Sequence, residues 1–474
     1  MQQGDTHHRL WAVPVAMFLF TWTLTTHGKY SMSGDEPHYL MIAESLVTDH
    51  DLDVANNYAR NDGRLFGHDH LEMGLHAVRS RNGSVLSIHD IGLAVALAPI
   101  YAIARTLAQL PGERLLKRFR MDRGLFAYSL IGLFLIALTA TGFTLLASAL
   151  SAVDDLGPVV ALVIAAGISP PIVSHAFLVF PEVAALFVTS VVVWFSLKRP
   201  GVVDVRLLMS LLLMLGTLPW THHKYLLYVP GLLFVVIWKR WELIRALQPI
   251  TIGAGLLLFV GPQLALQGWT WHAWGTLGGA LTTQGVPFSF ESLRLGLVGL
   301  WIDQRSGLLA YAPLYWIVPA CWRITWKRTW PFMIPFVLLY IPAAAFVIWW
   351  AGFAPAARYL VPSVPLLLVP MAEALRYRAV RFAIALLLLP QAVIDAVIWQ
   401  HPRWMWPAPE GNVALRSLGL MGRMYGDVLV NVQGGASLFP ALWIGAALAI
   451  ASATVAWLAT QERHSFAAPA IDRS

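Results

Sequence analysis

Two adjacent carboxylates, Asp35 and Glu36, follow the first apolar segment of the chain, in the sequence SGDEPHYL at residues 33–40. Pro37 suits the first position of a helix, and negative charge is favourable near a helix N-terminus, so the pair could serve only to begin a helix. A carboxylate at such a position can also take a proton from an attacking hydroxyl group. Helix capping and general-base catalysis both remain open, with Asp35 and Glu36 as the candidate catalytic residues.

The segment that follows is rich in residue types that bind metal ions. It contains HDHLE at residues 68–72 and HDIG at residues 89–92. The spacing of these side chains matches no familiar zinc motif. A metal site that includes His89 is therefore one interpretation, and a polar, solvated loop is the other.

Two further charged residues lie at the ends of apolar runs. Glu182 follows FP at residues 180–181, and Lys224 lies in WTHHKY at residues 220–225. A lone lysine between two apolar runs suits an anion such as a lipid phosphate. The alternative for both residues is a side chain that reaches the membrane interface without a ligand.

Two arginines have the same kind of setting. Arg305 and Arg358 each precede an apolar run. An arginine beside such a run needs an anionic partner, and a phosphate or diphosphate is a natural one. An internal salt bridge to Asp35, Glu36 or Glu182 is the alternative.

The composition assigns these residues to a membrane protein. Hydrophobic residues make up 57% of the 474 residues and charged residues 12%, whereas a soluble chain carries about 25% charged residues. The mean hydropathy is +0.62. Long unbroken apolar runs predict helices, because the strands of a membrane barrel alternate in polarity. A single soluble domain and a disordered chain are excluded, and the single cysteine excludes an intrachain disulfide.

Clusters of basic residues orient the apolar runs. The positive-inside rule places the basic segments 239–240, 323–328 and 376–378 in cytoplasmic turns. The net charge of +7 has the same origin, so we expect no nucleic-acid partner. Runs 307–320 and 331–350 then count as separate spans. The prediction is an all-α polytopic protein of about twelve transmembrane helices, one integral membrane domain over residues 1–474, with both termini in the cytoplasm.

Residues 27–123 form a long outer loop in this topology, and the candidate site residues all fall on the outer face. The count of crossings holds only if residues 90–110 form a juxtamembrane or re-entrant helix, since the basic stretch 111–123 then lies along the outer headgroups. The alternative is that residues 90–110 span the membrane and another segment does not.

In their order and common sidedness, these segments resemble the GT-C superfamily of membrane glycosyltransferases, and most closely its bacterial relatives of the protein mannosyltransferases and of the lipid A aminoarabinose transferase. The resemblance covers most of the chain. It rests on GDEPHY at residues 34–39, PE at 181–182 and RYLVP at 358–362. Residues 220–225 and RSGLLAYAP at 305–313 also look like family segments.

The resemblance implies juxtamembrane helices in the first outer loop and a polyprenyl-phosphate-linked sugar as donor. It implies that Asp35, with Glu36 beside it, activates an acceptor hydroxyl group and that the reaction inverts the anomeric carbon. A divalent metal is the one cofactor it suggests, with Asp35, Glu182 and His89 as candidate ligands. The candidate substrate-binding residues are Glu182, His222, Lys224, Tyr225, Arg305, Arg358 and Tyr359.

The same resemblance implies a multi-pass protein of a bacterial cytoplasmic membrane, with its active site on the periplasmic face and a lipid, glycan or protein as acceptor. A transporter or flippase for a glycolipid or an anionic solute is the alternative, because it would use the same cations to bind a moving anion. An O-antigen polymerase or ligase would share the outer basic residues but would not need the two carboxylates at residues 35–36.

Overall fold

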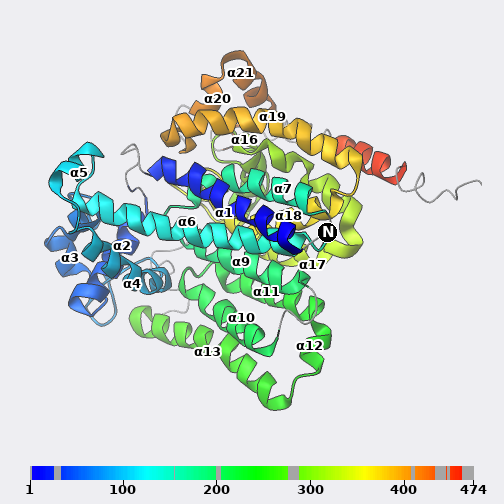
Figure 1. The fold of residues 1–474 in the computed structure, drawn as a ribbon. Coiled ribbons are helices and arrows are strands. Elements are labelled where there is room, and N and C mark those ends of the chain that lie inside the picture. The colour runs from blue at the N-terminus through cyan, green and yellow to red at the C-terminus, as the bar shows by residue number, and fades with distance from the viewer. Residues whose placement is uncertain are drawn as a thin grey trace, which may run out of the picture.

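The computed structural model describes residues 3–25, 32, 34–153, 155–198, 204–275, 288–406, 411–432, 445 and 449–461. Over these residues the chain is mostly helical, and the one sheet among them is a two-stranded hairpin. Figure 1 shows α1 (Gln3–Thr25), α6 (Arg123–Leu150) and α19 (Arg378–Gln400) running in roughly the same direction across the molecule. The predicted helical class is confirmed.

The long helices form two groups. In the first, α1, α7 (Leu156–Ile168) and α9 (Pro181–Leu197) pack around α6. The helix α6 begins where the Asp122 carboxylate accepts a hydrogen bond from the Leu125 N–H at 2.7 Å. In the second group α11, α15 and α18 pack on α17, and α10 packs on α13.

The bounds of the second group follow chain order. The helices are α10 (Val205–Thr217), α11 (Tyr225–Lys239), α12 (Trp241–Arg245), α13 (Pro249–Trp274), α15 (Phe290–Ile302), α16 (Leu308–Tyr311), α17 (Val318–Ala345), α18 (Val364–Ala374), α20 (Val413–Ser417) and α21 (Gly419–Val428). Short irregular helices connect them: η3 (Leu218–Trp220), η4 (Pro313–Ile317), η5 (Arg358–Ser363) and η6 (Pro402–Met405). In the first group, α8 (Ile172–His175) leads into α9.

The predicted first loop folds into a compact set of short elements, which Figure 1 shows gathered at one end of α1 and α6. The helix α4 covers the predicted juxtamembrane segment and packs on α2 and α6. Residues 26–31 and 33 of the predicted loop lie outside the described residues. The elements are α2 (Glu36–Glu44), η1 (Ser45–Asp49), α3 (Ala55–Ala59), η2 (Asp62–Phe66), β1 (Ala77–Arg79), β2 (Val85–Ser87), α4 (Ile91–Leu107) and α5 (Glu113–Arg118).

Three of the described helices are long and apolar enough to cross a membrane by length and composition: α6, α13 and α19. Six further apolar helices in the described residues are shorter. The prediction of about twelve spans therefore stays a prediction. One predicted turn is wrong, because α17 runs unbroken through the basic segment 323–328. No glycine or asparagine interrupts residues 318–330, and long basic side chains are good helix formers.

Three of the basic segments that were predicted to be cytoplasmic meet in space. Lys239 donates a hydrogen bond from Nζ to the Arg328 carbonyl oxygen at 3.2 Å. Arg328 pairs through Nη1 with Glu373 Oε1 at 2.6 Å, and Arg376 pairs with the same carboxylate oxygen. The predicted inner markers thus share one region, as a common side of the membrane requires.

A buried ion pair fixes α2 against α4. The Glu44 carboxylate, 2% exposed, accepts a hydrogen bond from Tyr101 Oη at 2.6 Å and pairs with Arg105 Nη1 at 2.6 Å. Thr48 also donates to Glu44, at 2.7 Å. These contacts join the start of the first loop to its longest helix.

We expect Glu44→Gln to loosen the first loop. The substitution removes a charge that two buried hydrogen bonds and an ion pair depend on, which corresponds to about 1–3 kcal/mol. Thermal unfolding in detergent should show a lower midpoint, and limited proteolysis should cut residues 45–110 faster. Glu113→Gln is the matched control, because its pair with Lys117 is exposed and 3.9 Å long. Equal midpoints for the two variants would contradict the assignment.

Candidate active site

A buried guanidinium group joins two carboxylates that are far apart in the sequence. Arg358 donates from Nε to Glu182 Oε1 at 2.8 Å and from Nη1 to Asp35 Oδ2 at 2.9 Å. The Arg358 side chain is 7% exposed, and its Cζ lies 3.9 Å from the ring centroid of Phe180. The structure therefore shows the internal salt bridge that was one of the two interpretations of Arg358.

Local backbone geometry brings these three residues together. Asp35 directly precedes α2, Glu182 lies in the first turn of α9, and Arg358 begins η5. Gly34 has φ +60°, and a Cβ added there would lie 2.6 Å from the Phe353 carbonyl oxygen. Only glycine fits this close approach, so the residue before Asp35 sets the distance between the first loop and residues 351–357.

Lys224 completes a cluster of two acids and two bases, to which we refer as the Arg358 cluster (Asp35, Glu182, Lys224 and Arg358). Lys224 Nζ donates to Glu182 Oε1, the same oxygen that Arg358 binds. Burial lowers the pKa of Lys224 to about 8, although Glu182 opposes the shift, so the ammonium group is still mostly protonated at neutral pH. The four formal charges sum to zero.

Two buried polar atoms beside the cluster have no hydrogen-bond partner in the described part of the chain. They are Glu182 Oε2 and the hydroxyl group of Tyr225, and both residues are 0% exposed. The ammonium group of Lys224 lies 5.2 Å from the ring centroid of Tyr225 and 4.8 Å from that of Tyr359. Unpaired buried polar atoms are costly, so these positions suit a polar ligand.

The electrostatics of Asp35 follow from this pairing. Burial alone would raise the pKa of its carboxyl group, but the Arg358 guanidinium outweighs burial and holds the pKa below its ordinary value. Asp35 is therefore ionised at neutral pH. Asp35 Oδ1 accepts no hydrogen bond from the described residues, so one carboxylate oxygen is available to a ligand.

Three histidines lie beside Asp35. Imidazole nitrogens of His76 and His89 and a carboxylate oxygen of Asp35 all lie within 4.8 Å of one another. His38 stacks on His76 with ring centroids 3.6 Å apart. Burial lowers the pKa of His89 to about 4 and that of His38 to about 2, and it lowers the pKa of His76 as well, so all three rings are neutral at pH 7. The structure groups Asp35 and His89 with His76, and not with the predicted third ligand Glu182.

His222 and His223 lie next to the cluster on the segment before α11. His223 Nδ1 pairs with the Asp90 carboxylate, whose other oxygen accepts a hydrogen bond from the His223 N–H at 2.8 Å. His222 Nδ1 lies 3.8 Å from the Asp90 carboxylate and accepts a hydrogen bond from the Lys224 N–H at 3.2 Å. Asp90, which directly precedes α4, therefore fixes the segment that carries Lys224.

The second predicted catalytic acid has another environment. Glu36 is 0% exposed, and its Oε2 accepts hydrogen bonds from the Tyr128 hydroxyl group at 2.7 Å and from the Val179 N–H at 2.9 Å. These contacts lead to α6 and to the segment before α9. Glu36 therefore anchors the start of α2 to the first helix group, which is the structural alternative to a catalytic role.

Arg305 is placed near the cluster by its backbone. The Ala357 N–H donates to the Ser306 carbonyl oxygen at 2.9 Å, so residues 305–306 run beside the residue before Arg358. Asp303, which is 0% exposed, accepts hydrogen bonds from the Arg305 and Ser306 N–H groups. Arg305 Nε is buried and has no hydrogen-bond partner among the described residues, so this cation is not committed to an internal pair there.

His76 is the residue of this site that the sequence interpretation missed. It directly precedes β1, and His89 lies two residues after β2, in a hairpin whose register pairs Ala77 with Ser87. The dipeptide Asn82-Gly83 between two short apolar runs is a strong hairpin signal. That signal would have placed His76 and His89 side by side.

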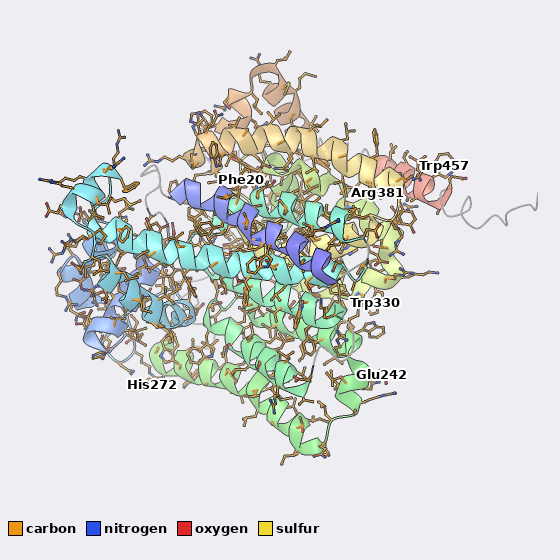
Figure 2. All side chains as sticks on the ribbon, viewed as in Figure 1. Phe20, Glu242, His272, Trp330, Arg381 and Trp457 are labelled. Atoms are coloured by element: carbon orange, nitrogen blue, oxygen red, sulfur yellow. The ribbon has the colours of Figure 1, made fainter. Side chains whose placement is uncertain are left out.

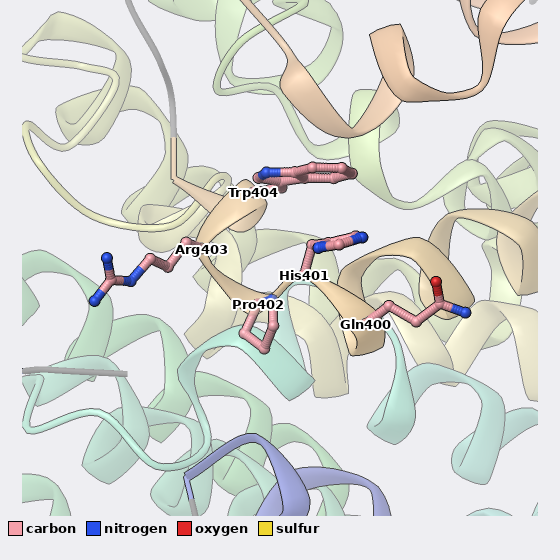
Figure 3. A pocket seen from close by; sticks show the side chains of 5 residues that line it. All are labelled: Gln400, His401, Pro402, Arg403 and Trp404. Carbon is pink, nitrogen blue, oxygen red and sulfur yellow. The ribbon is translucent and has the colours of Figure 1, made fainter. Parts of the chain in front are cut away.

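A surface pocket lies at the end of α19, and Figure 3 shows its lining residues, Gln400, His401, Pro402, Arg403 and Trp404. The rings of His401 and Trp404 stack with centroids 3.9 Å apart. None of the lining residues belongs to the Arg358 cluster. We assign the candidate site to the cluster, because paired buried charges and unpaired polar atoms carry more chemistry than an open aromatic surface.

Comparison with protein-family models, with curated proteins and with solved structures gives no match to this chain. The functional argument therefore rests on the residues and their geometry.

The His223–Asp90 pair predicts a pH-dependent stability difference. Burial alone would lower the pKa of His223, but the Asp90 carboxylate outweighs it and raises the pKa above its ordinary value. A raised pKa contributes stability that is complete below the unfolded value of about 6.5 and is lost as the pH rises through the folded value. Asp90→Asn should therefore lower the unfolding midpoint most at pH 6 and progressively less toward pH 9.

The measurement is the difference in midpoint between the wild type and the variant at each pH. This difference cancels the contributions of His38, His76 and His89, which have the opposite sign because their pKa values are lowered. A difference that is constant from pH 6 to 9 would contradict the charged pair.

Proposed function

We propose that the chain is a membrane glycosyltransferase that transfers a sugar from a polyprenyl-phosphate donor to an acceptor hydroxyl group on the outer face of a bacterial cytoplasmic membrane. The observation that carries the proposal is the Arg358 cluster. It combines an ionised carboxylate that has a free oxygen with two cations, at the end of the helices where the first-loop elements gather. A membrane-embedded, phosphate-linked donor needs both kinds of group.

The carboxylate serves the acceptor in this proposal. Asp35 accepts the proton of the acceptor hydroxyl group as the hydroxyl oxygen bonds to the anomeric carbon. The bond between that carbon and the donor phosphate breaks on the opposite side, so the configuration inverts. The polyprenyl phosphate leaves with the electron pair of the broken bond, and no nucleotide is needed.

The cations serve the donor. Lys224 and Arg358 stabilise the charge that grows on the leaving phosphate, and Arg305, which lies on the adjacent segment, can add a third cation. The tyrosines 225 and 359 line the same position beside Lys224. Together with Glu182, which holds both cations through one oxygen, they give the donor phosphate a prearranged polar site.

The low pKa of Asp35 has a consequence for the order of events. As long as Arg358 pairs with it, Asp35 is a weak base. A donor phosphate that draws Arg358 toward itself weakens this pairing and raises the basicity of Asp35. Base strength would then increase only when the donor is bound, which limits proton loss in the absence of substrate.

Asp35→Asn should abolish sugar transfer. Loss of a general base lowers the rate by about 100- to 10,000-fold. The assay is transfer by purified enzyme from a panel of polyprenyl-phosphate pentoses and hexoses. Asp69→Asn is the matched control, because Asp69 is exposed on the same loop. Full activity of Asp35→Asn would exclude Asp35 as the base, and no transfer by the wild type from any donor would favour the transporter alternative.

Arg358→Ala should weaken use of the donor far more than it lowers the yield of folded protein. The KM for the donor should rise, because a paired phosphate ligand is lost, and Arg358→Lys should restore it only in part, since an ammonium group cannot bridge two carboxylates. Kinetics at varied donor concentration, compared with yield from size-exclusion chromatography, separate the effects. Equal loss of activity and yield would leave Arg358 as a structural salt bridge only.

A further inference from the structure

The strands β1 and β2 bring two imidazoles to one carboxylate. His76 Nδ1 lies 3.0 Å from His89 Nε2, and a carboxylate oxygen of Asp35 completes a group whose atoms are all within 4.8 Å of one another. A tetrahedral zinc site with bonds of about 2.0–2.1 Å has ligand atoms about 3.3 Å apart. The group therefore matches such a site after shifts of about 1 Å.

We propose that Asp35, His76 and His89 bind one divalent cation of the zinc class. Two imidazoles and one carboxylate favour Zn²⁺ over Mg²⁺ and Ca²⁺, which prefer sites made of oxygen ligands. Three protein ligands leave a fourth position for water or a substrate oxygen, as in zinc sites that perform catalysis.

The backbone around the ligands is rigid. The Ile88 N–H donates to the His76 carbonyl oxygen at 2.9 Å, and the Ser87 hydroxyl group donates to the same oxygen at 3.2 Å. The His89 N–H in turn donates to Ser87 Oγ at 3.2 Å. Both ligands are thus fixed by the end of the hairpin before any cation binds.

The turn of the hairpin is anchored as well. The Arg81 N–H donates to the Ala273 carbonyl oxygen at 2.9 Å, and Asn82 Nδ2 lies 2.9 Å from His272 Nε2. Figure 2 shows His272 at one end of α13 and Glu242 near the other. The metal-binding hairpin is therefore attached to the second helix group, and not only to the first loop.

His38 is the outer partner of the site. Its ring stacks on His76 at an interplanar angle of 10°, and its Nδ1 lies 2.6 Å from the Tyr58 hydroxyl group. A residue of this kind sets the orientation of a ligand ring without binding the metal itself. Asp35 is already oriented on its other side by Arg358, which occupies Oδ2.

The inference does not depend on sugar transfer, because its test measures bound metal. If the proposed function also holds, a cation at the fourth position would lower the pKa of a bound hydroxyl group. That effect would offset the low basicity of Asp35.

The test begins with the wild-type protein in detergent, stripped with a chelator and reloaded. Mass spectrometry of bound metal should give one Zn²⁺ per chain, and Co²⁺ loading should give the intense visible absorption of a four-coordinate site. Neither readout requires a variant to fold or a substrate to be known. The absence of stoichiometric Zn²⁺, or a Co²⁺ spectrum typical of the aqueous ion, would overturn the proposal.

Variants then assign the ligands. In competition titrations, His76→Gln and His89→Gln should each raise the Kd for Zn²⁺ by more than about 100-fold, and His38→Gln by about 10-fold, as for an outer partner. His50→Asn is the matched control and should leave the Kd unchanged, because His50 is exposed on the same loop and asparagine tolerates its φ of 60°. Wild-type affinity in the double variant His76→Gln/His89→Gln would place the cation elsewhere.

Discussion

The rest of the structure depends on the burial of the Arg358 guanidinium group. A charge removed from water in an apolar protein is stable only when ionised partners and hydrogen bonds surround it. Asp35 and Glu182 provide those partners, and each comes from a different segment. The need to neutralise one buried cation therefore brings the first loop, the start of α9 and the segment before η5 to one point. Lys224 adds a second cation and requires the segment before α11 to join them.

Neighbouring contacts then serve this convergence. Glu36 anchors the start of α2 to α6, so that Asp35, one residue earlier, faces Arg358. Asp90 holds the segment that carries Lys224 through His223. The acidic residues of the first loop thus divide into one that meets the cations and others that position it. This division explains why adjacent carboxylates at residues 35–36 have different environments.

The sequence predicts the members of the cluster better than it predicts their partners. Sidedness, read from the basic segments, groups Asp35, Glu182, Lys224 and Arg358, because a membrane leaves only two places for a charge. It does not specify which helix faces which, so the pairing of Glu182 with both cations could not be derived. The misplaced turn at residues 323–328 has a related cause. The positive-inside rule locates charges near a membrane face but does not require the helix to end there.

A paired cluster favours a stationary site over a moving one. A transporter that carries an anion between two faces must open its binding residues alternately to each side. Here Arg358 and Lys224 share one oxygen of a fully buried Glu182, and separating either pair would leave an unpaired charge at a cost of several kcal/mol. Separate segments of both helix groups meet at these ion pairs, so relative motion of the groups would break them. The same geometry suits an enzyme, because fixed charges need no reorganisation when charge develops on a leaving phosphate.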